Sequence, residues 1–310
     1  MTAAPSQPLR STDAQVDVRV EITEDAAAFL AAASDHLALD PVLTTVVSTV
    51  AARAAAAADR GAEPPAHPQW FAVVRDHDDL VVGVAMRTAP FEPHPLFVLP
   101  MDDEAARALA RAVHARGDRV RGANGALPAT EVFLEEIAAL QGGEVRTDEL
   151  TRLFELGDLV EPPLPAGRLR LASPDDAEVV LAWFDAFGAD AAEQAGRVDE
   201  TPPFHTTDDI AQRIEEARVW LWEDEAGVPV HVTGHSLPAY GVSRVGPVYT
   251  PREHRGHGYA GATVAAVSRM LRDEGVRVCL FTDQANPTSN RIYQALGFRP
   301  VVDMANLLLD

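Results

Sequence analysis

Residues 248–260 constrain the fold of this chain more than any other segment. They read V-Y-T-P-R-E-H-R-G-H-G-Y-A and lead into a helical pattern in which Ala260, Val264, Val267 and Leu271 share one face. A predicted strand therefore runs into a loop with two glycines that opens a helix. Backbone N–H groups of such a loop point at one spot, where the helix N-terminus adds about half a positive charge, so the loop suits a phosphate or pyrophosphate. The alternative is a tight turn without a ligand.

The composition of this loop favours the ligand-binding interpretation. Gly256 and Gly258 let the backbone approach a ligand closely, and Arg255 adds a cation. His254 and His257 lie three residues apart in the same loop. Because zinc would need further ligands, we interpret them as solvated loop histidines and predict no metal site.

A second segment, nearer the C-terminus, has a related pattern. Residues 276–282 are predicted to form a strand, and Asn286 with Pro287 can cap the helix that follows. This helix is predicted to stop at Gly297, and Phe298 opens another strand. The order strand, glycine loop, helix, strand, helix, strand is thus expected over the last third of the chain.

The loop and the second segment together resemble the GNAT family, the Gcn5-related N-acetyltransferases. The first signature of that family is Arg or Gln, two residues, Gly, one residue, and Gly or Ala. It is matched by Arg255, Gly258 and Ala260. The resemblance covers residues from about 168 to 310 and is strongest over 248–298.

The second signature of the family is an Asn, then Leu-Tyr some six residues later, then Gly-Phe. It is matched by Asn286, by Ile292-Tyr293 and by Gly297-Phe298. Two motifs in the family's order and spacing make the resemblance specific.

The resemblance implies that acetyl-CoA is the co-substrate and that the loop grips its pyrophosphate. It also implies a bulge in the strand before the loop, for which Gly246 and Pro247 are suited, and free N–H groups there for the pantetheine arm. The cofactor-binding residues implied by the match are Val248, Tyr249, Thr250, Arg255, Gly256, His257, Gly258, Tyr259, Ala260, Asn286, Ser289, Asn290 and Tyr293.

The catalytic residues implied by the resemblance are less complete. Tyr293 matches the position that commonly protonates the leaving thiolate, and a packing role in the core is the alternative. Family members often place a carboxylate base on the strand before the loop, but residues 243–250 contain no acid. His231 and His235 share one face of the preceding strand, and we assign His235 as the second catalytic residue, with a polar structural role as the alternative.

The chain of 310 residues suggests two domains at roughly 150 residues each. Proline-rich residues 157–167 have the composition of a linker, residues 1–16 that of a loose tail. We therefore predict one domain over 17–156 and a GNAT acetyltransferase domain over 168–310. The fold class is α/β (α+β).

The two halves share a weak internal repeat. Residues 70–85 and 219–234 both follow the pattern strand, acidic turn, strand, each preceded by two predicted helices and followed by a strand and a helix. We predict two tandem GNAT-like domains, each a mixed, mostly antiparallel twisted sheet flanked by helices. Two unrelated α/β domains are the alternative.

The first domain is predicted to have lost the cofactor site. Where the phosphate loop would lie, residues 96–104 contain no glycine, and Pro100 lacks a donor N–H. Asp102, Asp103 and Glu104 would repel a pyrophosphate. We therefore interpret this half as a degenerate GNAT-like domain.

Charge and composition narrow the partners. With 26 basic and 47 acidic residues the net charge is −21, which repels nucleic acids and anionic lipid surfaces. There is no lysine, which excludes Schiff-base chemistry, and the single cysteine, Cys279, is expected in a buried strand. Without a visible export signal or membrane span, we expect a cytoplasmic protein.

These features favour an acetyl-CoA-dependent N-acyltransferase that acts on a primary amine by direct attack on the thioester. The acceptor is expected to be a small-molecule amine or a peptide, and the sequence does not indicate an oligomeric state. The alternative is a non-catalytic acyl-CoA-binding sensor or scaffolding protein. Transfer from an aminoacyl-tRNA is disfavoured by the negative charge.

Overall fold

Both halves of the chain are built on one plan. The structure, a computed structural model, describes residues 18–197 and 203–310, so the tail predicted over 1–16 lies outside it. The first half contains β1 (Arg19–Thr23), α1 (Ala26–Leu39), α2 (Thr45–Asp59), β2 (Trp70–Arg75), β3 (Val81–Arg87), β4 (Leu96–Val98), α3 (Asp103–Ala115), β5 (Gly122–Ala126), α4 (Ala129–Gln141) and β6 (Val145–Leu156).

The second half repeats this order. It contains β7 (Arg168–Leu171), α5 (Ala177–Gln194), α6 (Thr207–Glu215), β8 (Val219–Glu223), β9 (Pro229–His235), β10 (Val242–Tyr249), α7 (Tyr259–Asp273), β11 (Arg277–Asp283), α8 (Pro287–Ala295) and β12 (Phe298–Leu309). Single turns of 3₁₀ helix precede α5 and α7. The predicted α/β class with two repeated halves is confirmed, and the alternative of unrelated domains is wrong.

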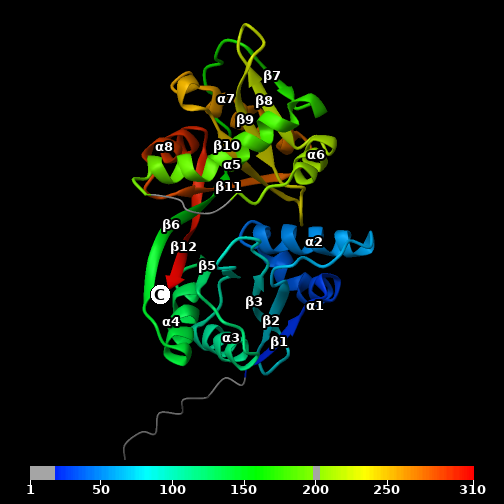
Figure 1. Ribbon diagram of the computed structural model, residues 1–310, viewed down its shortest axis with the longest axis vertical. Helices are drawn as coiled ribbons and strands as arrows, with labels where there is room; N and C mark the ends of the chain where they lie inside the picture. The colour runs from blue at the N-terminus through cyan, green and yellow to red at the C-terminus, as the bar shows by residue number, and fades with distance from the viewer. Residues whose placement is uncertain (1–17, 198–202) are drawn as a thin grey trace, which may run out of the picture.

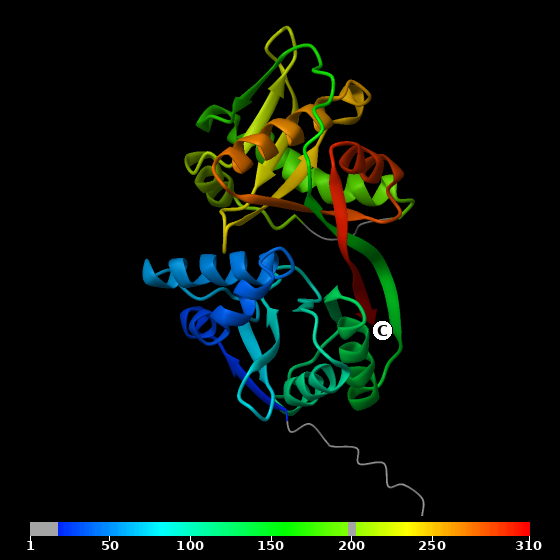
Figure 2. The same ribbon diagram turned by 180° about the vertical axis from the view of Figure 1, so that it is seen from behind.

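The strands form one sheet in the order β1-β2-β3-β4-β5-β12-β6-β11-β10-β9-β8-β7. Each half gives its last strand to the other: β12 pairs with β5, and β6 pairs with β11. The two exchanged strands are long and pair with each other antiparallel between the halves (Figures 1 and 2). Hydrogen bonding therefore joins the two halves on either side of the linker predicted over 157–167, and the domain limits stay predictions.

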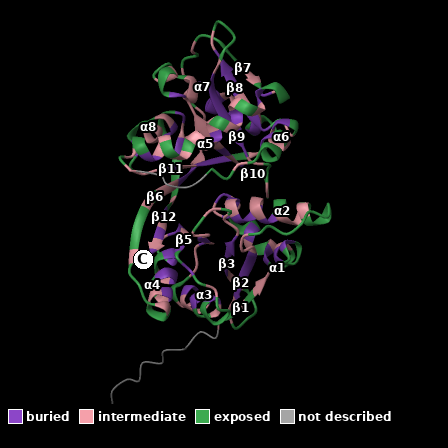
Figure 3. Cartoon of the chain, viewed as in Figure 1, coloured by how far each residue is buried: buried purple, intermediate pink, exposed green. Residues whose placement is uncertain are grey.

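Helices cover both faces of the sheet in each half. In the first half, α1 and α2 pack on one face through Phe29 against Phe71, whereas α3 and α4 pack on the other through Phe133. In the second half, α5 and α6 cover the face that carries Val232, and α7 and α8 cover the face that carries Val245. Buried residues accordingly follow the sheet at the centre of each half (Figure 3).

Helix starts follow the local sequence signals. Asp25 caps α1 by accepting hydrogen bonds from the N–H groups of Ala27 and Ala28. Ser173 forms a capping box with Asp176 at the 3₁₀ turn that leads into α5. These helices therefore begin where a side-chain oxygen can satisfy otherwise free N–H groups.

Two strands, β1 and β5, were not predicted from the sequence. β1 precedes the first helix, and β5 has the sequence G-A-N-G-A, which offers no bulky apolar side chain. β5 lies between β4 and β12, and a Cβ added at Gly125 would collide with the carbonyl oxygen of Val98. Close backbone approach therefore selects small residues there.

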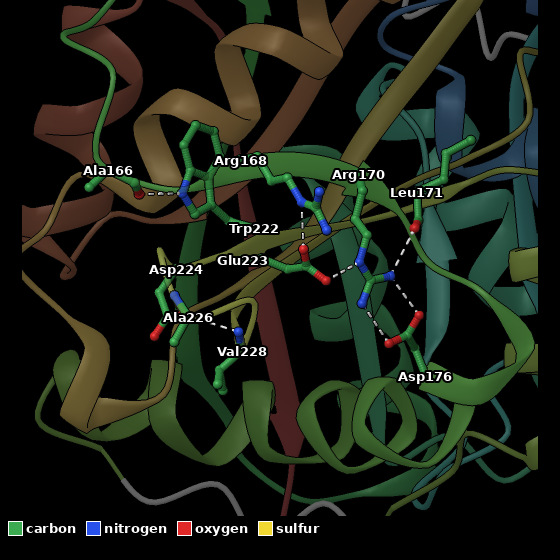
Figure 4. A network of polar contacts seen from close by, with 10 residues as sticks. All are labelled: Ala166, Arg168, Arg170, Leu171, Asp176, Trp222, Glu223, Asp224, Ala226 and Val228. Atoms are coloured by element: carbon green, nitrogen blue, oxygen red, sulfur yellow. Dashed lines mark hydrogen bonds and ion pairs between the residues drawn. The ribbon is translucent and has the colours of Figure 1, made fainter.

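An ion-pair network fixes the start of α5 against the β7–β8 edge of the sheet (Figure 4). The Arg170 guanidinium donates two hydrogen bonds to Asp176, at 2.7 and 2.9 Å, and a third to Glu223. Arg168 also donates to Glu223 at 2.8 Å. Arg170 and the Ser173 cap lower the pKa of Asp176 to about 2.

We predict that Asp176 makes the fold acid-sensitive. Because the folded-state pKa lies below the usual 3.8, its stabilisation is present above about pH 4 and is lost as the pH falls towards 2. Asp176→Asn should lower the free energy of unfolding at pH 7 by roughly 1–2 kcal/mol and flatten its decline between pH 4 and 2. Urea unfolding at several pH values measures both.

The matched control is Glu161→Gln, which breaks the half-exposed pair with Arg269. It should change the free energy of unfolding by less than about 0.5 kcal/mol. Equal effects of the two substitutions would contradict a special role for Asp176.

Candidate functional site

Two parallel strands of the second half, β10 and β11, stop pairing after Arg244, and we call the interval between their later residues the slot. β10 and β11 pair only where Val242–Arg244 face Arg277–Cys279, and no later pair occurs in the described chain. The pairing of β10 with β9 shifts register between Val245 and Val248, on either side of Gly246 and Pro247. The predicted bulge is therefore confirmed, and it turns the second half of β10 away from β11.

The loop after β10 ends in a helix N-terminus without a side-chain cap. Residues 250–258 connect β10 to α7, with Gly258 as N-cap and no acid in the first turn of the helix. Gly256 and Gly258 have left-handed φ values of 82° and 86°, and a Cβ added at either would meet no atom within 4 Å. Glycine is needed there for backbone conformation, and the space above the loop is open. The N–H groups of Tyr259 and Ala260 lie at this uncapped end of the helix.

The cations of this loop are held by α5. The Nε of Arg255 donates to the Thr250 carbonyl at 3.0 Å, and its Nη2 donates to Asp190 at 2.7 Å. Arg252 pairs with Asp190 at 3.0 Å and also with Glu193. The acidic helix α5 thus fixes both arginines beside the loop.

Asp190 also binds the end of β10. The Tyr249 hydroxyl donates to Asp190 at 2.9 Å, and burial together with this bond raises the pKa of Tyr249 to about 12. Sequence reasoning missed Asp190, because it lies some sixty residues before the loop it contacts and no local pattern marks it.

The turn between β11 and α8 is held by its two asparagines. Asn286 caps α8, as predicted, by accepting from the N–H groups of Thr288 and Ser289 at 3.1 Å each. Asn290 Nδ2 donates to the Asn286 carbonyl at 2.7 Å and to that of Asp283 at 2.9 Å. These side chains shape the turn beside the slot, and their contact with a cofactor stays a prediction.

Tyr293 lies on α8 with its ring in the core. It packs edge-on against Phe298 at 6.0 Å between ring centroids, and its hydroxyl has no hydrogen bond to any described residue. Burial raises the pKa of Tyr293, so the phenol keeps its proton at neutral pH. Packing and proton donation are both compatible with this position.

The two histidines of β9 face the α7 side of the sheet, because they alternate with Val232, which packs towards α5 and α6. His231 is fully buried, with ring nitrogens 2.7 Å from the hydroxyls of Thr250 and Thr233, and burial lowers its pKa to about 3. His235 has Nδ1 3.1 Å from the Ser236 carbonyl and a buried Nε2 without a partner among the described residues.

A histidine that sequence reasoning did not single out lies on the α5 side. His205 Nδ1 is 3.2 Å from Asp185 Oδ1, and its ring packs edge-on to Phe184 at 5.4 Å. Phe184 in turn reaches the bulge: a Cβ added at Gly234 would lie 3.3 Å from Phe184 Cζ and 3.4 Å from Pro247 Cδ. His205 is therefore one aromatic ring away from the bulge.

The protonation state of His205 follows from its surroundings. Burial lowers its pKa against the opposing effect of Asp185, so the imidazole is neutral at physiological pH. The sequence offered no signal for His205, because its partner Asp185 lies twenty residues earlier in the chain and no local pattern joins the two.

The equivalent position in the first half is closed. Only residues 99–102 connect β4 to α3, and Asp102 accepts a hydrogen bond from Ala105 N at 2.7 Å. A carboxylate of the chain itself thus occupies the helix N-terminus that a phosphate would need. This agrees with the degenerate site expected from the sequence.

Other potential reactive groups lie elsewhere. Cys279 is buried, and burial raises the pKa of its thiol to about 11, as expected for a core residue. Among the described residues, Asp76, His77 and Asp78 form the one group with metal-ligand spacing, in the exposed turn between β2 and β3. No helix in the described ranges is long and apolar enough to cross a bilayer.

Comparison with known proteins gives matches for this site and for the whole fold. The family model described as FR47-like protein matches residues 230–305, which contain β10, the loop and α8. An acetyltransferase from the GNAT family of Colwellia psychrerythraea covers 94% of this chain and 100% of its own, with a TM-score of 0.55 and 11% identity. The chain has the GNAT fold. The resemblance predicted from the motifs is confirmed.

The GNAT fold extends over both halves. A tandem GNAT protein from the clavulanic acid biosynthesis pathway covers 93% of this chain and 97% of its own, with a TM-score of 0.56 and 18% identity. A GCN5-related N-acetyltransferase from Sphaerobacter thermophilus gives 94% of both chains, a TM-score of 0.56 and 15% identity. Sequence identities this low establish the fold alone, so the activity has to be inferred from the residues of the site.

One curated relative has a name that does not refer to acetyl transfer. Ribonuclease 3 of Alcanivorax borkumensis is 31% identical over 153 residues, which are 49% of this chain and 57% of the relative. The chain therefore spans little more than half the length of that protein.

Proposed function

We propose that the protein is an acetyl-CoA-dependent N-acyltransferase whose working site lies in the second half of the chain. One observation carries the proposal: β10 turns away from β11 at a bulge and leads directly into an uncapped helix N-terminus with two left-handed glycines. A thioester with a long arm and a pyrophosphate matches a slot that ends in an anion site. A net charge of −21 repels nucleic acid, so we propose a small-molecule amine or peptide as acceptor.

The cofactor contacts follow from this placement. The N–H groups from Gly256 to Ala260 surround the anion site, and the pyrophosphate would lie there within reach of Arg255. To reach the phosphate, the Arg255 guanidinium would share its charge between the ligand and Asp190. The edge of β10 from Val248 to Thr250 would face the pantetheine arm.

The acceptor approaches from the α5 side of the slot. The α7 side is filled by Val245, Val264 and Leu296, which belong to one packed core. On the α5 side lies the pair of His205 and Asp185. With Nδ1–H directed at Asp185, the neutral His205 imidazole has an Nε2 that no described residue engages and that can take a proton from the amine.

The reaction then needs only these groups. The amine nitrogen attacks the thioester carbonyl, the C–S bond breaks, and the amide forms. His205 takes the proton that the amine loses, and Tyr293, on the other side of the slot, gives one to the thiolate. We therefore propose His205 in place of His235, whose ring lies on the α7 face.

A specific observation also supports the non-catalytic alternative. β10 carries no acid, so a base on the strand itself is missing. An acyl-CoA sensor would bind acetyl-CoA as tightly but would release no thiol in the presence of amines. A thiol-release assay over a broad panel of amines separates the two functions.

We predict that Gly258→Asp abolishes acetyl-CoA binding. The substitution puts a carboxylate at the anion site and a side chain on a backbone with φ of 86°. Calorimetric titration should show at least a hundredfold loss of affinity.

The control is Gly275→Asp, at the other end of α7. Gly275 has a φ of 79° and equally open surroundings, so the backbone strain and the added charge are the same. Its affinity should stay within about threefold of wild type. Equal losses in both variants, or none in either, would refute the placement of the pyrophosphate.

We predict that Tyr293→Phe and His205→Gln each lower kcat by roughly 10²–10⁴, with acetyl-CoA affinity little changed. The first removes the phenol proton and keeps the ring packed against Phe298, and the second removes the base. Steady-state thiol release with any acceptor that supports turnover measures both.

His235→Gln is the competing variant. If the base lies on the α5 side, its kcat stays within a few-fold of wild type once its folding is verified by circular dichroism. A large loss in His235→Gln with normal turnover in His205→Gln would return the role to His235.

A further inference from the structure

A cavity of about 240 Å³ lies where the two halves meet, beside the mouth of the slot. Its walls include Phe97 and Asn124 from the first half, Arg244 and Phe281 from β10 and β11, and Asn306 from the exchanged strand β12. At about 30 Å³ per water, this volume is on the order of eight waters, enough for a molecule the size of an amino acid. None of the residues assigned to acyl transfer above lines this cavity.

Arg244 is the charged group of the cavity wall. It is the last β10 residue that pairs with β11, directly before the bulge, and it alternates with Val245, which packs under α7. Its Nη1 is shielded from solvent and has no hydrogen-bond partner, and the guanidinium forms no ion pair with any described residue. Arg244 as a whole is half-buried, and a partly desolvated guanidinium without a partner among the described residues is stabilised when an anion joins it.

The charges around Arg244 strengthen the need for an anion. Arg213 lies close enough that burial, Arg218, Arg53 and Arg244 together lower its pKa to about 10, with Asp209 opposing. The Arg213 guanidinium stands over the Phe184 ring at 5.7 Å, next to His205. A strongly acidic protein thus concentrates positive charge on the acceptor side of its slot.

Glu149, which is hydrogen-bonded to the wall residue Asn306, already has a cation. Glu149 pairs with Arg197 at 3.0 Å and accepts a hydrogen bond from Asn306 Nδ2 at 2.8 Å. It therefore has its own cation and leaves Arg244 uncompensated. Cys279 is the residue of β11 that pairs with Arg244, and burial keeps its thiol neutral by raising the pKa to about 11.

We propose that this cavity binds the carboxylate of the acyl acceptor, with Arg244 as its partner, so that the substrate is a small amine that also carries a carboxylate. The class of acceptor rests on the proposed acyl transfer, whereas carboxylate binding at Arg244 stands apart from it. The sequence-based preference for a small-molecule amine is thereby narrowed to amino acids and similar amino carboxylates.

The chemistry of the walls favours a carboxylate over a phosphate. One unpartnered guanidinium balances one negative charge and can bind both oxygens of a carboxylate. Amide groups of Asn124 and Asn306 and the Thr151 hydroxyl offer further polar contacts, and the rings of Phe97 and Phe281 suit an apolar substituent. A doubly charged phosphate would leave charge unbalanced.

Thermal unfolding of the full-length protein without acetyl-CoA tests the site. The probes are the common L-amino acids at about 10 mM, each compared with its carboxamide. At least one amino acid should raise Tm of the wild type by a few degrees, with less than half that shift from its carboxamide. Arg244→Met, which keeps the length of the side chain, should lose the shift, and Arg299→Met, at an exposed arginine, should keep it.

Arg244→Gln serves as a second variant if Arg244→Met does not fold. The proposal is overturned if no amino acid stabilises the wild type more than the Arg244 variant, or if acids and carboxamides stabilise it equally.

Acyl transfer is measured separately with the amino acid that binds. Thiol release should proceed in the wild type, and Arg244→Met should lower kcat/KM at least tenfold, mainly through KM. Binding without acetyl-CoA affinity would remove the proposed function and keep the carboxylate site. If the enzyme acylates amines that lack a carboxylate, and Arg244→Met does not affect this turnover, the proposed function is kept and the carboxylate site is removed.

Discussion

The exchange of the last strand between the two halves holds the structure together. β12 completes the sheet of the first half beside β5, and β6 completes that of the second half beside β11. The apolar residues Ala305, Leu307 and Leu309 of β12 lie in the core of the first half, although Phe298, at the start of the same strand, lies in the core of the second. Neither half can leave the other without losing a strand, so the cavity between them is a lasting feature of the molecule.

Although the two halves share this order of elements, they differ at the N-terminus of one helix, which is α3 in the first half and α7 in the second. In the first half the Asp102 carboxylate accepts a hydrogen bond from the N–H group of Ala105. In the second half Gly258 is the N-cap, no side chain of the described residues caps α7, and Asp190 on α5 positions the nearby arginines. The same backbone order thus gives one closed and one open end. The first half also contributes to the cavity: Phe97, Asn124 and Val46, at the start of α2, line it together with Arg244.

Much of the fold could be predicted from local patterns. The helix cap at Asn286, the glycine loop and the bulge at Gly246 and Pro247 are each encoded within a few residues, and the structure contains all three. β5 escaped because its glycines and alanines are chosen by close packing between strands and not by strand propensity. The roles of His205, Asp190 and Arg244 could not be predicted, because they depend on contacts between residues that are distant in sequence. His205 pairs with Asp185, Asp190 holds the arginines of the loop, and Arg244 has no ion-pair partner among the described residues.

The most direct test of a single working site is the stoichiometry of acetyl-CoA binding, measured by calorimetry on the full chain. A half that caps its own helix cannot also bind a pyrophosphate there, so the titration should end at one acetyl-CoA per chain. Two per chain, or none at millimolar ligand, would contradict the division into one open and one closed half.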